Sequence, residues 1–499
     1  MENRILTSQN PAIIAGYTIS LLLIAWLSRC VYYGLFHPLC HVPGPRLAAL
    51  SRWWLFFKEM QGKPHEVILD LHRTYGSLVR IAPDEVSVNG HQAYLEIYGQ
   101  NSKFLKAPYY YNAFKSHTHN LFTMSDKEDH SSERRLYSHA FSRANILKYE
   151  NMICDKVIRL MNQMSDSVQR GEPIPLSPAC RSLTLGTISE WAFGNPMRLS
   201  DDKTFESSLY HTFDTVTPVS IFFQHFPTMR RLQRWLGALR FPFLLNPIGD
   251  MEKCVKEGLE KEKMAKQSDL DLRNTMFGNV ITKAEQKGTP IEDTQMISEG
   301  VLMIFAGTDT TAATLSNGLY SLLKRPDLYT RLQQELLTVM PTLESRPTVM
   351  QLESLPLLDA CIKEGLRHVC PVRGRLPRVV PPEGWKFGNL YLPPGTLVAS
   401  TPLYECRNEE AFPKPTEYLP ERWLVKDRSN LLAHFQPFST GPRQCIGQNL
   451  SMIEQFLAIA HFVRRFTPIH VIGPDPDLKE FSTLWFKSPL NVELRLEES

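Results

Sequence analysis

A short segment around Cys445 holds the strongest chemical signal in the sequence. It reads FQPFSTGPRQCIGQNL over residues 435–450, with a pattern made by Phe438, Gly441, Arg443, Cys445 and Gly447. From average residue usage, this combination should arise by chance in on the order of one chain in ten thousand. A cysteine thiolate binds metal ions, and backbone N–H groups at the start of a following helix favour its ionised form. A cysteine in this position could bind a metal as the thiolate, and a buried structural cysteine at a helix start is the alternative.

This segment resembles the haem-binding loop of the cytochrome P-450 family of haem-thiolate monooxygenases. The resemblance implies that Cys445 is the axial ligand of a haem iron. It also implies that Phe438 covers the sulfur, that Gly447 lets the following helix approach the macrocycle, and that Arg443 pairs with a haem propionate. In this enzyme class, the thiolate ligand pushes electron density onto the iron and favours cleavage of the O–O bond.

A second motif lies on a long predicted helix. Ala306-Gly307-Thr308-Asp309-Thr310 resembles the family's oxygen-activating segment, a pattern that alone would occur in roughly a few of every hundred chains. Ala306 and Gly307 are small, which leaves room for O₂ over the iron. Glycine with two threonines predicts a local break in the helical hydrogen bonding that admits water. In the family pattern Thr310 holds the water that delivers a proton, and Asp309 connects that water to solvent, so both are implied as catalytic.

Two further motifs follow in the family's order. Glu364-x-x-Arg367 matches its E-x-x-R, and the Pro420–Trp423 segment, PERW, is similar to its P-E-R-F. The resemblance implies that Glu364, Arg367 and Arg422 form a charged triad that locks the haem-side core. Because a buried charge left without its partner is costly, we expect loss of folding or of haem when one member is removed.

Three more residues are candidates for holding the haem propionates. His130 and Arg134 share one helical face at i and i+4 and resemble the family's W-x-x-x-R segment, with histidine in place of tryptophan. Leu376-Pro377-Arg378 similarly places Arg378 for a propionate. Histidine can hydrogen-bond where tryptophan would, but its charge depends on pH. A solvated helix residue is the alternative interpretation of His130, so its contact with haem is left open.

The elements that must position these residues are predicted to be mainly helical. Helical periodicity is clearest over residues 64–75, 125–141, 145–169, 293–325 and 327–340. Strand-like runs lie at residues 78–88, 376–399 and 489–496. These patterns predict a mainly α chain of the α+β class, with one haem-binding catalytic domain over residues 37–499. The resemblance covers roughly residues 40–499 and implies the family's fold, a large helical body with a small β-rich lobe.

The first 36 residues predict a membrane anchor. Residues 11–28 carry no charge, and with residues 31–36 the apolar run reaches the roughly 20 residues that span a bilayer. A cleaved signal peptide is the alternative, although no small-x-small cleavage site follows the run. Arg4 lies before residues 11–28, whereas three arginines lie after them: Arg29, Arg46 and Arg52. We therefore expect a single-pass protein of the endoplasmic reticulum membrane with a cytosolic catalytic domain.

Composition and missing motifs exclude several classes of protein. The 499 residues include 55 Lys and Arg and 52 Asp and Glu, and a net charge of +3 argues against bulk nucleic-acid binding. The nine cysteines include no C-x-x-C pair of the zinc or redox type. The sequence also lacks G-x-G-x-x-G, a G-x-x-x-x-G-K phosphate loop, H-E-x-x-H and G-x-S-x-G. Reducing equivalents would therefore come from a partner protein or from another cofactor.

The resemblance implies a haem-thiolate monooxygenase that uses O₂ and electrons from NADPH. Its cofactors would be haem b (iron protoporphyrin IX) and NADPH, the latter acting through a separate membrane-bound NADPH–cytochrome P-450 reductase. We expect that reductase to dock near four basic residues, for which ordinary solvated charge is the alternative: Arg135, Lys148, Arg464 and Arg465. The other expected partners are the lipid bilayer and a lipophilic small molecule, with no nucleic acid.

Family segments for substrate recognition map near residues 104–122, 217–245, 372–378 and 481–486. They are rich in aromatic residues, which suits a bulky lipophilic ligand. The segment around residues 103–141 resembles anchored enzymes of fungal secondary metabolism, which favours a terpenoid or polyketide-type product. Two alternatives stay open: a haem-thiolate isomerase or dehydratase that does not use O₂, and a non-catalytic, membrane-tethered binder of haem or of a lipophile. The acid–alcohol pair at residues 309–310 favours the monooxygenase.

Overall fold

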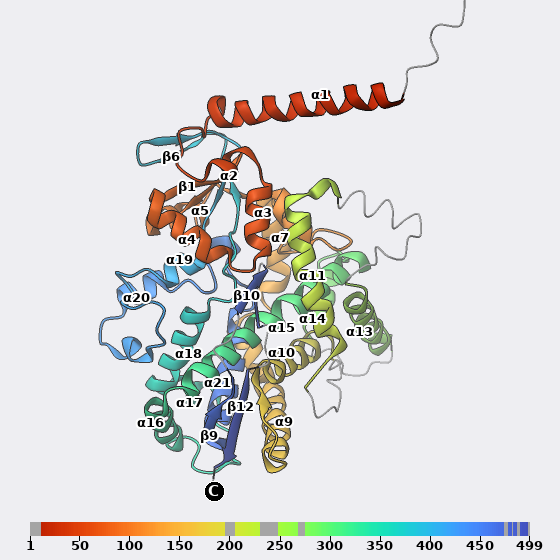
Figure 1. Ribbon diagram of the computed structural model, residues 1–499. Coiled ribbons are helices and arrows are strands. Elements are labelled where there is room, and N and C mark those ends of the chain that lie inside the picture. Colours follow the sequence, from red (N-terminus) through yellow and green to blue (C-terminus); the bar gives the residue numbers. More distant parts are fainter. Residues whose placement is uncertain are drawn as a thin grey trace, which may run out of the picture.

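The computed structural model describes residues 11–194, 205–229, 248–267, 275–473, 478–481, 483–486 and 490–497. Figure 1 shows a helical body with a smaller lobe of short strands and helices at one end, and helix α1 extends beyond that lobe. This agrees with the mainly α organisation of the α+β class that the sequence predicts.

Helices account for most of the described chain. The longer ones are α1 (Pro11–Val31), α3 (Trp53–Met60), α4 (Pro64–Tyr75), α5 (His91–Tyr98), α7 (Lys127–Ser138), α9 (Glu150–Gln169), α10 (Leu176–Phe193), α11 (Ser208–His225), α13 (Gly249–Gln267), α14 (Met276–Gln286), α15 (Asp293–Leu323), α16 (Pro326–Leu337), α18 (Pro356–Val369) and α21 (Gln448–Arg465). The shorter ones are α2 (Arg46–Leu50), α6 (Pro108–Tyr111), α8 (Arg143–Ile146), α17 (Val349–Glu353), α19 (Pro402–Cys406) and α20 (Ser429–His434). Single turns lie at η1 (Tyr32–Phe36), η2 (Asn112–Phe114), η3 (Leu147–Tyr149), η5 (Pro420–Leu424) and η6 (Gly441–Arg443).

In the described part of the chain, the strands form four small sheets. They are β1 (Leu78–Ala82), β2 (Glu85–Val88), β3 (Leu105–Lys106), β4 (Ile174–Pro175), β5 (Arg378–Val379), β6 (Trp385–Phe387), β7 (Leu390–Leu392), β8 (Leu397–Ala399), β9 (Phe466–Val471), β10 (Leu478–Phe481), β11 (Thr483–Phe486) and β12 (Asn491–Leu496). The largest sheet has the order β1-β2-β8-β5-β3, in which only the β2–β8 pairing is parallel. This sheet brings β3 and β5 side by side, although about 270 residues separate them in sequence.

Several predicted helices are present with similar bounds, for local chemical reasons. Helix α4 covers the predicted residues 64–75, because Pro64 occupies its first turn and Gly76 follows its last residue with a φ of 93°. Helix α7 begins where the Asp126 side chain accepts hydrogen bonds from the N–H groups of Glu128 and Asp129. These signals act within a few residues, so the sequence alone reveals them.

Helix α15 runs through the middle of the body and packs against α10, α13, α18 and α21 (Figure 1). At 1.5 Å per residue its 31 residues span about 46 Å. The helix is continuous, so the predicted local break near Thr310 is wrong. The Thr308 and Thr310 hydroxyls each donate to the carbonyl four residues earlier, at 2.7 Å, and in this way they are accommodated within the helix.

Helix α10 was not predicted, and burial on every side explains why. Fifteen of its 18 residues are buried, so it shows no alternation between a polar and an apolar face. It packs along α15 so closely that a Cβ at Gly307 would lie 3.0 Å from Ile188. The small size of Gly307 therefore serves helix packing, whereas the sequence reasoning assigned it to the space above the iron.

The N-terminal helix is apolar and unburied. Residues Ile14–Phe36 form one candidate membrane span of 23 residues, with a mean hydropathy of 1.6 and none of its length buried against the body. By length and composition this helix could cross a membrane. The packed body begins soon after it, because Leu39 and Val42 are buried in the core of the small lobe.

Candidate active site

Cys445 lies in the loop that joins η6 to α21. The Cys445 N–H closes this loop by donating to the Phe438 carbonyl at 2.9 Å. The N–H groups of Gly447 and Gln448 donate to the sulfur. Burial raises the pKa of the Cys445 thiol, whereas the Gly447 N–H, the Arg134 charge and the Gln448 N–H each lower it. Burial outweighs these groups in the protein alone, but a bound metal cation would deprotonate the thiol outright.

Close packing fixes the path of this loop. Gly441 has a φ of 71°, and a Cβ there would lie 2.3 Å from the Tyr98 carbonyl oxygen at the end of α5. Only glycine fits, because both the backbone conformation and the space exclude a side chain. A Cβ at Gly447 would lie 3.9 Å from the Cys445 sulfur, and Phe438 is half-buried against the main core. The loop is therefore held in one place relative to the body.

Cys445 and Ala306, which the sequence analysis places on opposite sides of the haem, are both accessible to solvent. Cys445 is accessible to solvent although protein atoms surround it. Ala306 is exposed, although it lies midway along the largely buried α15. Helices α15 and α21 meet at a hydrogen bond of 3.1 Å between the Thr311 and Ser451 hydroxyls. In sequence, Thr311 follows Ala306 closely and Ser451 follows Cys445 closely. The side chains therefore leave space beside the thiol and beside Ala306.

The structure gathers four predicted propionate-binding residues into one basic cluster. His130 and Arg134 come from α7, Arg378 from β5 and Arg443 from η6. Burial lowers the pKa of His130 to about 3, and the nearby charges of Arg443, Lys106, Arg134 and Arg378 contribute in that order. His130 is buried, so the solvated interpretation of this residue is wrong.

Lys106 of β3 is the fifth member of this basic cluster, and the sequence analysis missed it. It is buried, and its Nζ donates to the Phe122 carbonyl at 2.6 Å. Burial and the charges of Arg378, Arg443 and Arg134 lower the pKa of Lys106 well below its usual value. The pairing of β3 with β5 places it beside Arg378, a contact that no local pattern reveals.

Within the described part of the chain, no member of the basic cluster forms an ion pair with a carboxylate, although the Asp126 charge acts on Arg443. Arg443 donates to the carbonyls of Met124, Ser125 and Asp126, and Arg134 donates to the Gln444 carbonyl. Among the described residues, the ion pairs include no carboxylate partner for any member of the cluster. Gathering cations without anions is unfavourable unless a ligand supplies the negative charge. A group with two carboxylates and a metal fits this cluster and the thiol together, which is the chemistry of haem.

The acid and the alcohol on α15 have separate partners. The Asp309 carboxylate receives two hydrogen bonds from Arg181 of α10, at 2.9 and 3.1 Å, and Arg181 also pairs with Asp214 of α11 at 2.9 Å. Burial alone would lower the pKa of Arg181, but Asp309 and Asp214 raise it. The Thr310 hydroxyl donates to the Ala306 carbonyl instead. A link between Thr310 and solvent through Asp309 would therefore use the acceptor positions of the carboxylate that Arg181 leaves free.

The three predicted structural residues meet at one carboxylate. Glu364 receives two hydrogen bonds from Arg367, at 2.7 and 2.8 Å, and one from Arg422 at 3.2 Å. Trp423 adds an indole N–H at 2.9 Å. Arg367 uses its remaining donors on the carbonyls of Cys406, Pro415 and Glu417. Glu364 and Arg367 are fully buried, so this arrangement joins α18 to the chain that precedes the Cys445 loop.

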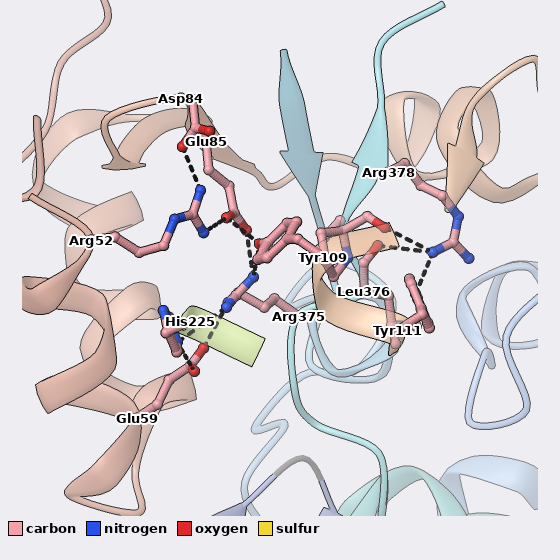
Figure 2. Close-up of polar contacts among 12 residues, drawn as sticks. Arg52, Glu59, Asp84, Glu85, Tyr109, Tyr111, His225, Arg375, Leu376 and Arg378 are labelled. Atoms are coloured by element: carbon pink, nitrogen blue, oxygen red, sulfur yellow. Dashed lines mark hydrogen bonds and ion pairs between the residues drawn. The ribbon is translucent and has the colours of Figure 1, made fainter. Parts of the chain in front are cut away.

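A second charge network, also missed by sequence reasoning, joins the small lobe to α11. Arg375 pairs with Glu59 of α3 and Glu85 of β2, each at 2.6 Å. Burial would raise the pKa of Glu59, but Arg375 and His225 lower it to about 2. Figure 2 shows Arg375 directed into this network and Arg378 directed to the opposite side, toward Tyr111. Residues 372–378 therefore anchor the lobe on one side and serve the basic cluster on the other.

Some aromatic residues of the predicted recognition segments are buried in the core, and others are only half-buried. Tyr110 and Tyr111 are buried, and Tyr109 donates to Glu85 at 2.6 Å. Phe114 and Phe122 are half-buried, with ring centroids 5.3 Å apart. Residues 230–245 and residue 482 lie outside the described residues.

One residue of the predicted docking surface does not face solvent. Arg464 is buried, and its Nε donates to the Met340 carbonyl at 2.9 Å, so its assignment to that surface is wrong. Arg135 and Lys148 are exposed. A docking surface on this side would therefore rest on those two residues and on the half-exposed Arg465.

Comparison with known proteins identifies relatives of this chain. Residues 42–492 match the family described as Cytochrome P450. The chain is 30% identical over 468 residues to "Cytochrome P450 monooxygenase macH" of Penicillium terrestre, covering 90% of this chain and 91% of that protein. It is 28% identical to "Cytochrome P450 monooxygenase BOT1" of Botryotinia fuckeliana, with 86% and 84% covered. It is 27% identical to "Cytochrome P450 monooxygenase aneF" of Aspergillus aculeatus, with 96% and 98% covered.

Proposed function

The chain belongs to the cytochrome P450 family, and we propose that it works as a haem-thiolate monooxygenase in which Cys445 binds the haem iron. The observation that carries this assignment is an accessible, N–H-bonded thiol together with a buried or half-buried basic cluster whose members form no ion pair with a carboxylate among the described residues. Haem bound through a thiolate supplies oxygen activation and favours O–O cleavage. The reduced carbon monoxide difference spectrum tests the ligand directly.

The residues of this chain would hold haem b in two ways. The Cys445 sulfur would bind the iron, while Lys106, Arg378 and Arg443 would bind the two propionates with His130 and Arg134. Each propionate contact is a charge-assisted hydrogen bond, which is about twice as strong as a neutral one. Ala306 would lie on the oxygen side, with Gly307 next to it packed against α10, and Phe438 and Gly447 would lie beside the sulfur.

Removal of the propionate charges should weaken haem binding. Apoprotein reconstituted with the iron protoporphyrin IX dimethyl ester is expected to retain it at least about tenfold less tightly than haem b, because the ester cannot form the ionic contacts. Lys106→Met should reduce this preference, as measured by transfer of haem to apomyoglobin. Lys103→Met is the matched control, since Lys103 is exposed and pairs with Glu383. Equal retention of both haems by the wild-type protein would contradict the assignment of the cluster.

Thr310 is proposed to hold the water that delivers a proton for oxygen activation, next to the accessible Ala306. Thr310→Ala removes that hydroxyl, and we expect product formed per NADPH consumed to fall about tenfold or more, since general acid catalysis contributes roughly 10²–10⁴-fold. Thr310→Ser should retain most of the coupling. Thr314→Ala, one turn away, is the control. Product formation by the wild type without NADPH and O₂ would indicate the isomerase or dehydratase instead.

Residues 1–36 are proposed to anchor residues 37–499, a single catalytic domain, in the endoplasmic reticulum membrane. Deletion of residues 1–36 should shift the protein from the carbonate-resistant membrane fraction to the soluble fraction with its haem retained, because the apolar window of the helix is unburied and the Tyr33 carbonyl contacts only Arg80 of the small lobe among the hydrogen bonds described. The comparison uses the full chain expressed in the same cells. Persistence of the truncated protein in the carbonate-resistant fraction would argue for another membrane contact.

Electrons are proposed to come from a membrane-bound NADPH–cytochrome P450 reductase, and the substrate is proposed to be a bulky lipophilic molecule. The resemblance of the segment around residues 103–141 favours a secondary metabolite of terpenoid or polyketide type, and the similar proteins are fungal monooxygenases. The half-buried Phe114 and Phe122 suit such a ligand. Product identification in cells fed candidate intermediates tests this substrate class.

A further inference from the structure

Three potential metal ligands converge beside the Cys445 loop, on elements separate from the basic cluster. His91 begins α5, Glu405 lies in α19 and His434 ends α20. The Glu405 Oε2 is 2.6 Å from the His91 Nδ1 and 2.9 Å from the His434 Nδ1. One nitrogen from each histidine and one carboxylate oxygen lie within 4.8 Å of one another. We propose that these three residues bind a zinc ion.

The charge balance around Glu405 supports a cation at this position. Its side chain is 3% exposed, and the described ion pairs give it the two histidines as partners and no lysine or arginine. A buried carboxylate needs a compensating charge. The two histidines supply ring nitrogens with lone pairs, and a divalent cation bound to all three side chains would supply the positive charge beside Glu405.

The ligand types favour zinc over magnesium or calcium. Imidazole nitrogens suit zinc and similar transition metals, whereas magnesium and calcium prefer oxygen ligands. Two histidines and one carboxylate leave a fourth tetrahedral position for water. The His91 side chain is 32% exposed and the His434 side chain 12%, so water and metal can enter from the surface. Tetrahedral zinc bonds of about 2.0–2.1 Å place ligand atoms about 3.3 Å from one another, so the Glu405 oxygen would move away from the two histidine nitrogens by about 0.4–0.7 Å.

The proposed zinc site would connect three elements around the Cys445 loop. Helix α20 ends at His434, one residue before the segment that carries Cys445. Helix α5 contacts the same segment, where the Tyr94 hydroxyl lies 3.3 Å from the Ser439 hydroxyl. Zinc bound to His91, Glu405 and His434 would therefore hold both flanks of the loop together. This structural role is independent of the proposed reaction.

Zinc titration of the tag-free, full-length holoprotein tests the proposal. After removal of metals with EDTA and dialysis, Zn²⁺ is added in competition with a chromophoric chelator. We expect one site per chain of micromolar or tighter affinity. Glu405→Gln and the double variant His91→Ala/His434→Ala should each weaken binding at least about 10²-fold. His117→Ala is the matched control, since His117 is an exposed histidine 3.2 Å from Glu252, and it should leave the affinity unchanged.

Two further measurements separate specific zinc binding from misfolding or surface binding. Far-UV circular dichroism and the Soret absorbance must match the wild type for Glu405→Gln, which preserves the shape of the side chain. Anomalous scattering at the zinc edge from crystals soaked in Zn²⁺ should place one peak between His91, Glu405 and His434. Equal zinc affinity in wild type, Glu405→Gln and the double variant, or a peak elsewhere with none at these residues, would overturn the proposal.

Discussion

Replacement of Cys445 with alanine is expected to abolish the long-wavelength Soret band of the reduced carbon monoxide complex and to reduce substrate oxidation to background. The sulfur is accessible, receives two N–H hydrogen bonds and lies in a loop closed by the Phe438 carbonyl. Alanine retains the loop backbone but supplies no ligand for the iron, so any haem still held by the basic cluster would lack the thiolate signature. The difference spectrum and the haem content of the purified variant measure the two effects separately.

Cys40→Ala is the control for Cys445→Ala. Cys40 is also an exposed cysteine, but it lies between η1 and α2 in the small lobe. Its replacement should leave the carbon monoxide spectrum and the haem content unchanged. A Cys445→Ala protein with the wild-type Soret band would remove the basis of the haem-thiolate assignment.

Replacement of Arg367 with alanine is expected to prevent stable folding or haem retention. Arg367 donates two hydrogen bonds to the buried Glu364 and three to backbone carbonyls, and both side chains are fully buried. Loss of one member of a buried ion pair costs about 3–5 kcal/mol because it leaves the other charge uncompensated. That cost is a large part of the net stability of a typical protein. The haem-to-protein ratio of the soluble fraction and the denaturant midpoint measure the loss.

Two further variants show whether the effect of Arg367→Ala comes from the buried pair. Arg367→Lys keeps the charge but cannot reach all five acceptors, so we expect an intermediate loss. Arg346→Ala removes an arginine whose partner, Asp155, is exposed like itself, and it should change the midpoint little. Full haem incorporation by Arg367→Ala would show that the triad does not hold the haem-side core.

Local patterns predicted the parts of the fold that local forces control. Helix α4 has the predicted bounds because a proline and a glycine mark its ends. The strands β1, β2, β5, β8 and β12 fall inside the predicted strand-like runs. Helix α10 escaped prediction because its burial on all sides leaves no periodic signal.

The Cys445 loop and the Glu364 triad were also foreseeable, because short motifs in a fixed order carry them. Short motifs do not reveal the charged residues that other elements bring to the site. Lys106 joins Arg378 through the β3–β5 pairing, and Arg181 reaches Asp309 from a helix that the sequence did not indicate. Arg375 contacts Glu59 across more than 300 residues of chain. Such partners have no sequence spacing to recognise, since only packing brings them within hydrogen-bond distance.

By itself the sequence determined which atoms could do the chemistry: the sulfur at position 445, the hydroxyl at position 310 and the charges of the E-x-x-R pair. These depend on residue type and on spacing within a single turn or loop. Only the tertiary structure decided the electrostatic surroundings of those atoms. It paired Asp309 with Arg181, buried Arg464 and gathered five basic side chains that form no ion pair with a carboxylate among the described residues. The reason is that charges act through space over several ångströms, and the distances between them are set by the packing of elements far apart in the chain.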